Sequence, residues 1–557
     1  MSAAGLPATS GDEPVARTRF GAAAALLVAV AFVLRVHRIG DPELWVDEAF
    51  SAYMAMTDAG LARLLLTENS PPLYYLLLRW WTGFVGTGES MLRLPSAIFG
   101  SLFVAAIIWA GATWFDRRVG LWAGGFTAIA PLHIYYSQEA RAYSLLVFLI
   151  LLTYVLLERA LERYSRRSWA AVSLLMTLAV YTHYFAAFAL VPTAVLVWSY
   201  RRRPGAGSRR AAYGTALLAS GLLIFPWVLA TIRHRIRPME GTAYMLSLWQ
   251  QTPPEFAVPK SLELFGLGSQ TGFYPPMPKA FPLVAFPASL RLLALAVLLS
   301  LALWVAIPWA DEHLRISGLR QRKACLWTML LFPLATLWLI SAFVTPIYHV
   351  GRYDFIAFPA YGLLVGLAMA KAQALRKIGP LLALCLALGL ALPIGVKLTR
   401  YYDASAVAKY PSARAIAKLL EAEVKEGDVV VFTGFRGVRL HYYLGQLGIE
   451  WRGGACHDSV TGRNFGCRMF PRETEQHPAV YDAEPVMASP DAVRDDIDAF
   501  VSGLDKPDSV MWLVLQQGNF NQADPGLLGM LQQMGFQLTQ AGSAQTGDII
   551  RASRSPR

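Results

Sequence analysis

The sequence predicts a polytopic α-helical membrane protein that ends in a soluble α/β domain. Of its 557 residues, 55% are hydrophobic and only 16% are charged, whereas a soluble domain carries roughly 25% charged residues. Long charge-free runs alternate with short basic clusters, which is typical of membrane-spanning chains. After about residue 401, strand-like and helix-like patterns alternate instead, which indicates a small α/β unit. The net charge of +12 then reflects loops that set topology, and we expect no nucleic-acid partner.

The predicted spans are runs without Asp, Glu, Lys or Arg, which need about 20 residues to cross a bilayer, with short cases near 17. Such runs cover residues 20–34, 94–115, 119–138, 142–157, 168–200, 211–232, 292–310, 324–348, 355–370 and 378–396. The run 168–200 would make one helix of roughly 50 Å, too long for a single crossing. Basic clusters flank it on both sides, so we expect it to cross twice with a turn near Tyr181–Phe185. The prediction is therefore about eleven spans.

The distribution of basic residues predicts the topology. We expect a cytoplasmic tail at 1–19, a membrane domain at 20–400 with its first external loop at 39–93, and an extracytoplasmic α/β domain at 401–557. No cleavage site follows the first apolar run, so it is expected to remain as a span. The polar residues that topology alone does not explain all fall on the outer face: Asp47, Glu48, Glu68, Glu139, Arg141, His183, Arg233, Arg235, Arg237, His349 and Arg352.

The C-terminal region has two strand-like runs, Gly427–Gly434 and Ser509–Gln516, and a helical pattern at Ser412–Glu426. It contains no G-x-G-x-x-G or Walker motif, so we assign it no nucleotide and expect a lid or scaffold. Cys456 and Cys467 are able to form a disulfide if this region faces an oxidising compartment.

The first external loop carries the motif "LWVDEAFS" at Leu44–Ser51. From Phe50 onward, apolar residues fall on one face, which predicts a helix lying in the membrane interface until the Pro71-Pro72 pair breaks it. These apolar residues are Phe50, Met54, Leu61, Leu64 and Leu65. Asp47 and Glu48 are then either acids that favour a helix N-terminus or working groups of an enzyme.

Four segments in order, "LWVDEAFSAYMA", "ENSPPLYYLLLRWW", "MLRLPSAIFG" and "SQEARAYSL", resemble the GT-C glycosyltransferases, and "GRYDFIAFPAYGLL" resembles a late segment of that family. The resemblance is to the branch with dolichyl-phosphate-mannose protein mannosyltransferases, the lipid A aminoarabinose transferase and the RgtA/B/C/D-like lipopolysaccharide transferases. It covers roughly residues 20–400. It implies a GT-C fold and transfer of a sugar from a polyprenyl phosphate to an acceptor hydroxyl outside the membrane.

The resemblance matches Asp47 to the proposed general base of the family, with Glu48 as the second choice, and Glu139 to a second acidic loop residue. A base of this kind takes the proton of the attacking hydroxyl, and direct displacement implies inversion at the anomeric carbon. The leaving phosphate needs positive charge around it. The candidates for this role are Arg141, Arg352, Arg233, Arg235, Arg237 and His349. Each has a structural alternative: a partner of a neighbouring acid, a lipid-headgroup contact, or an interfacial histidine.

A divalent metal, Mg²⁺ or Mn²⁺, is the only cofactor that the acids suggest, since these ions prefer oxygen ligands. Glu68 matches a family position linked to metal, and Glu48 is the second candidate ligand. Related transferases carry a basic residue just after Glu68, whereas this chain has Asn69 and Ser70, which weakens a phosphate role there.

The expected partners are a polyprenyl-phosphate-linked sugar donor, a glycan, glycolipid or protein acceptor, and the lipid bilayer. The Ala-, Leu- and Arg-rich composition favours a bacterial plasma (inner) membrane, with the active site on the periplasmic or extracellular face of the cell envelope. Two alternatives stay open: a lipid-linked-saccharide transporter or flippase, which predicts charges within spans and internal repeats, and a noncatalytic membrane scaffold, in which Asp47 is dispensable.

Overall fold

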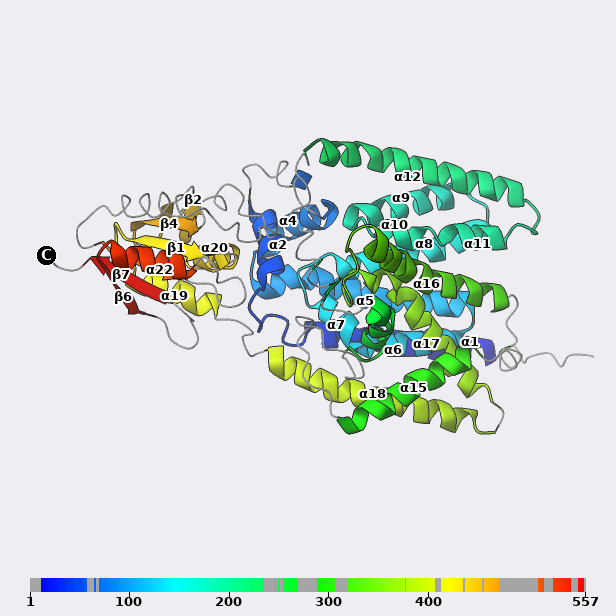
Figure 1. Cartoon of the computed structure of the whole chain (residues 1–557). Coiled ribbons are helices and arrows are strands. Elements are labelled where there is room, and N and C mark those ends of the chain that lie inside the picture. Colours follow the sequence, from blue (N-terminus) through cyan, green and yellow to red (C-terminus); the bar gives the residue numbers. More distant parts are fainter. Residues whose placement is uncertain are drawn as a thin grey trace, which may run out of the picture.

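Two parts of different secondary structure lie end to end in the computed structural model, a helical part and a part with strands, and α2 and α4 lie where they meet (Figure 1). The structure describes residues 12–57, 65–66, 70–234, 246, 249–250, 254–268, 288–306, 314, 319–375, 377–405, 412–433, 436–452, 455–470, 509–514, 524–541 and 549–554.

The helical part is a bundle whose longer helices run roughly along the direction that joins the two parts (Figure 1). Its helices are α1 (Asp12–Val36), α2 (Val46–Met56), α4 (Leu73–Val85), α5 (Glu89–Trp114), α6 (Arg117–Ile129), α7 (Pro131–Ser137), α8 (Tyr143–Glu162), α9 (Arg166–Thr182), α10 (Ala186–Leu190), α11 (Thr193–Ser199), α12 (Ala206–His234), α14 (Ala257–Leu267), α15 (Ala288–Ala306), α16 (Leu319–Phe343), α17 (Phe358–Gln373) and α18 (Gly379–Ser405), with 3₁₀ turns at Pro254–Phe256 and Asp354–Ala357.

Each run predicted as a span contains helix, which confirms the helical membrane architecture. Among the described residues, seven helices are long and apolar enough to cross a membrane: Arg17–Val36, Glu89–Trp114, Tyr143–Glu162, Ala206–Arg233, Leu319–Phe343, Asp354–Gln373 and Gly379–Asp403. The segments Ala186–Ser199 and Ala296–Ala306 are apolar but shorter. The run 168–200 is broken after α9, as its flanking charges required, and α10 and α11 continue it.

The predicted span 119–138 is divided into α6 and α7 at Pro131. Arg35 of α1 donates hydrogen bonds to the carbonyl groups that have no helical partner at this break. Proline has no N–H to give to the carbonyl four residues earlier, that of Thr127. Arg35 Nη2 donates to this oxygen at 3.0 Å, and Nη1 donates to Ala128 O at 3.1 Å. Its Nη2 also lies 2.8 Å from His133 Nδ1, which is therefore the acceptor, since arginine only donates. The buried guanidinium thus fixes the start of α7, which leads into the Glu139 loop.

The part with strands is a single seven-stranded mixed sheet in the order β2-β3-β4-β1-β5-β7-β6. Its elements are β1 (Val429–Thr433), β2 (Ile449–Arg452), β3 (Ala455–Asp458), β4 (Asn464–Phe470), β5 (Met511–Val514), β6 (Phe536–Gln540) and β7 (Ile549–Arg554), with helices α19 (Ala413–Glu423), α20 (Arg436–Gln446) and α22 (Asp524–Gln533). Strand β1 pairs in parallel with β4 and β5. Both predicted strands and the predicted helix are present, so the C-terminal α/β architecture is confirmed.

Cys456 and Cys467 form a disulfide between the neighbouring strands β3 and β4, with their Cα atoms 5.6 Å apart. The other two cysteines, Cys325 and Cys385, are free. Both disulfide partners are fully buried, so the bond is part of the interior of the α/β unit.

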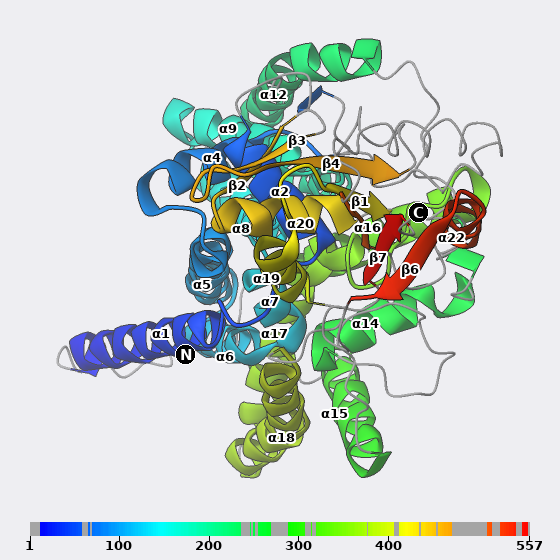
Figure 2. The same cartoon turned by 90° about the vertical axis from the view of Figure 1, so that its left-hand side faces the viewer.

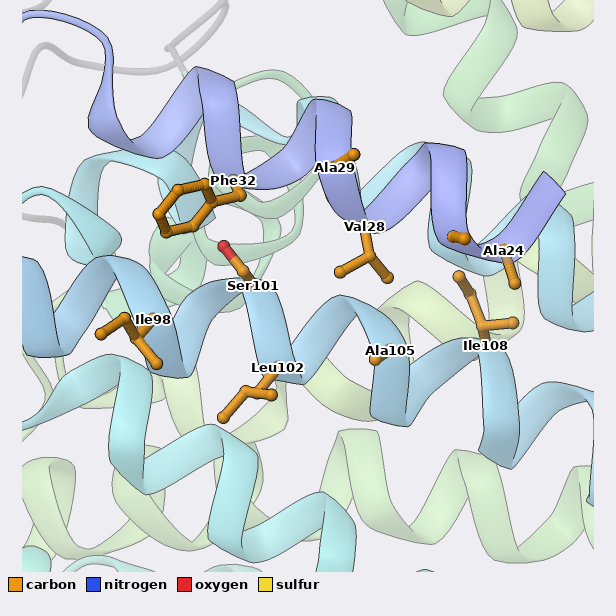
Figure 3. A pocket seen from close by; sticks show the side chains of 10 residues that line it. Ala24, Val28, Ala29, Phe32, Ile98, Ser101, Leu102, Ala105 and Ile108 are labelled. Carbon is orange, nitrogen blue, oxygen red and sulfur yellow. The ribbon is translucent and has the colours of Figure 1, made fainter. Parts of the chain in front are cut away.

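An apolar groove runs between α1 and α5 (Figure 3). It is lined by Ala24, Ala25, Val28, Ala29, Phe32, Ile98, Ser101, Leu102, Ala105 and Ile108. None of these side chains titrates, so the groove offers no acid, base or charge for chemistry. The exposed Leu26 and Val33 on the same helix α1 indicate that this side of the bundle faces lipid.

Helix α2 lies differently from its prediction. The expected interface helix would keep one polar face in water, but α2 is covered by α4 on one side and by α20 of the C-terminal part on another. Figure 2 shows α20 lying over α2 when the molecule is seen from its strand end. Phe50, Met54 and Leu65 are buried, as their spacing predicted, whereas Leu61 and Leu64 lie outside the described residues.

Candidate active site

Glu48 lies in a sealed ion pair with Arg93 of α5. Arg93 Nε donates to Glu48 Oε1 and Nη2 donates to Oε2, both at 2.7 Å. The backbone N–H of Ala140 donates to Oε1 at 2.8 Å. The side chains of Arg93 and Glu48 are only 3% and 2% exposed. Both carboxylate oxygens are therefore occupied, and the pair joins α2 to the start of α5 and to the Glu139 loop.

Asp47, one residue earlier, points to a second and more open pair of arginines. Its Oδ2 accepts a hydrogen bond from Arg352 Nη2 and lies 4.0 Å from Arg141 Nη2. The Asp47 side chain is 20% exposed. Burial by itself raises the pKa of Asp47, but the charges of Arg352 and Arg141 outweigh it and hold the pKa below its usual value. Asp47 is thus an ionised carboxylate within reach of the outside.

Aromatic rings hold Arg352 in place. Its Nε donates to the hydroxyl of Tyr143 at 2.6 Å. The guanidinium lies 5.8 Å from the ring centres of Trp45 and Tyr143 and 5.6 Å from that of Tyr353, within the range of cation–π attraction. The chain therefore fixes the direction of the Arg352 side chain while 18% of it stays exposed.

Arg141 bridges α2 and α4 beside Asp47. Its Nη1 donates to Tyr75 Oη at 3.3 Å and to Ser51 Oγ and Asp47 O at 3.4 Å. A small cavity adjoins it, lined by Ser70, Pro71, Tyr74, Tyr75, Arg141, Ala142, Tyr143, Thr182 and His183. Long hydrogen bonds of this kind hold the guanidinium only loosely, which leaves it able to turn toward a ligand.

Glu139 and His349 complete the polar group. Glu139 is 5% exposed, and its Oε2 has no hydrogen-bond partner among the residues that the structure describes. Burial, followed by the neighbouring Glu48 charge, raises the pKa of Glu139 to about 8, so this carboxyl holds its proton at neutral pH. Burial and the Arg352 charge lower the pKa of His349 to about 3, so its imidazole is neutral and its buried Nδ1 has no partner.

The other candidates lie elsewhere. Arg233 is exposed near the C-terminal end of α12. Arg235, Arg237 and Glu68 lie outside the described residues. His183 caps the end of α9 beside Tyr143 and Tyr353, and burial and the Arg141 charge lower its pKa to about 3. It therefore contributes an uncharged ring to the wall of the site.

The described residues do not fit a divalent metal. Among them, no group of three or more His, Cys, Asp or Glu side chains is placed to hold an ion. Glu48, the second candidate ligand, has both oxygens taken by Arg93, and Asp47 faces guanidinium groups, which repel a cation. A need for Mg²⁺ or Mn²⁺ stays a prediction that involves Glu68, and the chemistry proposed below uses no metal.

The C-terminal part makes hydrogen bonds to the segment that precedes Asp47. Arg439 of α20 donates through Nε to Leu44 O at 2.9 Å and through Nη2 to Glu43 Oε2 at 3.0 Å. Leu44 N donates to Tyr443 Oη at 2.9 Å. Glu43 also accepts the Ala413 N–H at 2.9 Å, so it caps α19, whose first N–H groups have no partner within the helix. Two helices of the α/β unit thus fix the backbone three residues before Asp47.

Sequence reasoning missed three of these roles. Arg93 was visible as a charge at the edge of the run 94–115, but its partner Glu48 is 45 positions away. The rings around Arg352 were indistinguishable from an interfacial belt of Trp and Tyr. Nothing local to Glu43 pointed to Arg439, which is 396 positions away.

Comparison with known proteins agrees with this architecture. Residues 69–229 match the family described as dolichyl-phosphate-mannose-protein mannosyltransferase. No curated protein sequence matches the chain. The crystal structure of ArnT from Cupriavidus metallidurans bound to undecaprenyl phosphate is similar over 96% of this chain and 99% of that chain, with a TM-score of 0.58 and 14% sequence identity. The apo structure of the same protein gives the same coverage and identity and a TM-score of 0.56.

A smaller share of the chain is similar to the oligosaccharyltransferase of Archaeoglobus fulgidus in its complex with Zn and sulfate. That similarity covers 75% of this chain and 61% of that chain, with 12% identity and a TM-score of 0.47. The match to ArnT spans the helical part and the C-terminal strands together, since it covers 96% of the chain. The chain is therefore a multi-pass membrane protein with the fold of the GT-C glycosyltransferases, and its residues 69–229 are similar to the dolichyl-phosphate-mannose-protein mannosyltransferases.

Proposed function

We propose that this protein is a membrane glycosyltransferase that moves a sugar from a polyprenyl phosphate to the hydroxyl of a glycan, glycolipid or protein on the extracytoplasmic face. The observation that carries the proposal is the contact of the partly exposed Asp47 carboxylate with Arg352, beside Arg141. The family match and the fold support the same class. The similar ArnT structure holds undecaprenyl phosphate, which supports a lipid phosphate as the carrier.

In this mechanism Asp47 is the general base. It takes the proton of the acceptor hydroxyl while the hydroxyl oxygen attacks the anomeric carbon from the side opposite the phosphate, which inverts that carbon. Arg352 and Arg141 bind the phosphate and stabilise the charge that it gains as the glycosidic bond breaks. Glu139, which holds its proton, is a hydrogen-bond donor to the donor lipid or the sugar rather than a second base.

Glu48 has a different role in this proposal from the catalytic one that its position next to Asp47 suggested. Its oxygens accept from Arg93 and from the Ala140 N–H, so it positions the start of α2 and the Glu139 loop relative to each other. Arg233 takes no part in this mechanism, because it is exposed on α12.

The active face is the extracytoplasmic one in this proposal, in a bacterial plasma membrane. The disulfide between Cys456 and Cys467 supports this side for the α/β unit, because disulfides persist in oxidising compartments. The basic loops support it too: helix α8 starts beside Arg141 and ends at Glu162, so the basic residues that follow it lie at the opposite end of the bundle.

The test is sugar transfer by the purified protein from a panel of synthetic polyprenyl-phosphate sugars. Wild-type protein should transfer at least one of them, and Asp47→Asn should lower the rate by about 10²–10⁴-fold, the usual contribution of a general base. Asp41→Asn, an acid of the same loop in an exposed pair with Arg38, is the control and should transfer normally. Wild-type-like transfer by Asp47→Asn would exclude Asp47 as the base.

A further inference from the structure

Two adjacent acids, Asp47 and Glu48, make ion pairs that differ in their exposure to solvent at the candidate active site. The pair of Glu48 with Arg93 is sealed, with side chains 2% and 3% exposed. The pair of Asp47 with Arg352 is open, with side chains 20% and 18% exposed. A sealed pair is a permanent part of the fold, since separating it would leave a buried charge alone. An open pair can exchange one partner for another of the same charge.

We propose that Asp47 and the lipid phosphate compete for the same guanidinium groups, so that phosphate binding frees the base and the base later expels the product. This inference rests on the proposed function. Its structural basis is that Arg352, the cation best placed to receive a phosphate, is occupied by Asp47 in the free protein. Arg141 lies on the other side of the same carboxylate oxygen, at 4.0 Å.

The charges of the site favour exchange over simple addition. Asp47 carries one negative charge and the two arginines carry two positive charges, so the group has a net charge of +1. The Glu48–Arg93 pair is neutral and internally satisfied. A polyprenyl-phosphate sugar is a phosphodiester with one negative charge, and its binding makes the group neutral. Once the phosphate has taken Arg352, Asp47 loses its strongest partner and becomes a better base.

The reaction then conserves this balance. The acceptor oxygen forms a bond to the anomeric carbon, the bond from that carbon to the phosphate oxygen breaks, and its electron pair stays on the phosphate. The proton of the acceptor passes to Asp47, which becomes neutral, while the phosphate becomes a monoester with two negative charges. The two arginines match these two charges, so the total charge of the site does not change during transfer.

Release of the lipid phosphate follows from the same competition. When Asp47 gives its proton to water, its carboxylate regains its attraction for Arg352 and displaces the phosphate. Three aromatic rings lie within 5.8 Å of the Arg352 guanidinium and hold it in place while its anionic partner changes. Asp47 therefore has a second task, that of an internal competitor that limits product retention.

The experiment measures binding of undecaprenyl monophosphate to purified protein, with no sugar transfer involved. Asp47→Asn should bind it at least about tenfold more tightly than wild type, because the competing carboxylate is gone, and tenfold corresponds to only 1.4 kcal/mol. Asp41→Asn removes a charge from the same loop and should bind like wild type. Equal or weaker binding by Asp47→Asn would overturn the proposal. Asp47→Ser serves the same purpose if the asparagine variant does not fold.

A double variant separates competition from a general effect of charge. In an Arg352→Gln background, where only the longer contact of Asp47 with Arg141 is left, competition predicts that Asp47→Asn improves binding much less than in wild type. An improvement as large as in wild type would indicate a long-range charge effect and would overturn the proposal. The proposed function has its own failure: wild-type protein that binds undecaprenyl monophosphate no better than uncharged undecaprenol would refute the donor class. Wild-type binding that Asp47→Asn leaves unchanged would refute only the competition.

Discussion

Arg93 holds both carboxylate oxygens of Glu48, with its Nε and Nη2 each 2.7 Å from one of them. This bidentate pair lies next to Asp47 in the chain and yet is closed to solvent. The two neighbouring acids therefore differ: Glu48 is a buried structural partner of Arg93, whereas Asp47 is the partly exposed acid to which we assign the chemistry.

The first prediction concerns this pair. Arg93→Met leaves the Glu48 carboxylate buried without its charge partner, and removal of one member of such a pair costs about 3–5 kcal/mol. Thermal unfolding in detergent should show a large loss of stability. Arg38→Met breaks an exposed pair, that with Asp41, and should cost less than about 1 kcal/mol. Similar small losses for both variants would contradict a structural role for Arg93.

Glu139 should make stability depend on pH. Its pKa is about 8 in the folded protein against 4.5 for the free side chain, so between these values the folded protein holds a proton that the unfolded chain has lost. Stability should therefore fall as the pH rises from about 4.5 to 8, by an amount on the order of a few kcal/mol.

Glu139→Gln should remove this pH dependence, because glutamine does not ionise. The measurement is the unfolding midpoint of both proteins across this pH range, with Glu423→Gln, at an exposed position of α19, as the control. A wild-type profile that is flat between pH 5 and 8 would show that Glu139 is ionised in the folded protein.

Arg35 should stabilise the protein through its hydrogen bonds at the break between α6 and α7. Arg35→Met leaves the carbonyl oxygens of Thr127 and Ala128 without their donor, and each buried unsatisfied group costs about 1–3 kcal/mol. We expect a lower unfolding temperature, and slower sugar transfer because α7 leads into the Glu139 loop. Arg17→Met, at an exposed position of the same helix, is the matched control. Normal stability of Arg35→Met would mean that other groups satisfy these carbonyls.

Arg439 should affect the rate of turnover indirectly, because it holds the backbone that precedes Asp47. Arg439→Ala removes the two contacts that hold Leu44 O and Glu43, and loosening of a catalytic group by about 1 Å costs on the order of 10²-fold in rate. We expect a lower kcat with an unchanged affinity for undecaprenyl monophosphate, since Arg352 and Arg141 stay in place.

The control for this prediction is Arg551→Ala, which removes an exposed arginine of β7. Arg439→Lys keeps one donor and should recover part of the rate. A weaker affinity for the lipid phosphate with an unchanged kcat would assign Arg439 to donor binding instead.

Much of the fold follows from local pattern. Charge-free runs predicted the helices of the bundle, and the basic clusters on both sides of 168–200 required the break that lies after α9. The charge rule also put Asp47, Arg141 and Arg352 on one face, where the structure brings them into contact. These are properties of single helices and of their orientation, which sequence carries directly.

The rest depends on contacts between distant segments. Asp47 and Glu48 are equivalent in sequence, and they differ only because Arg93 and the Ala140 N–H meet one and not the other. The burial of α2 was also unpredictable, since its cover comes from α20. Pairings of this kind are set by tertiary packing, which periodicity and charge do not encode.

The hydrogen bonds of α19 and α20 to Glu43 and Leu44 have a consequence for biosynthesis. Leu44 and Tyr443 are 399 positions apart, so the segment that carries Asp47 is synthesised long before the helices that anchor it, and long-range contacts of this kind form late in folding. A chain still being synthesised carries Asp47 on a segment without its anchor. The segment before Asp47 is therefore anchored only after α19 (Ala413–Glu423) and α20 (Arg436–Gln446) have been synthesised.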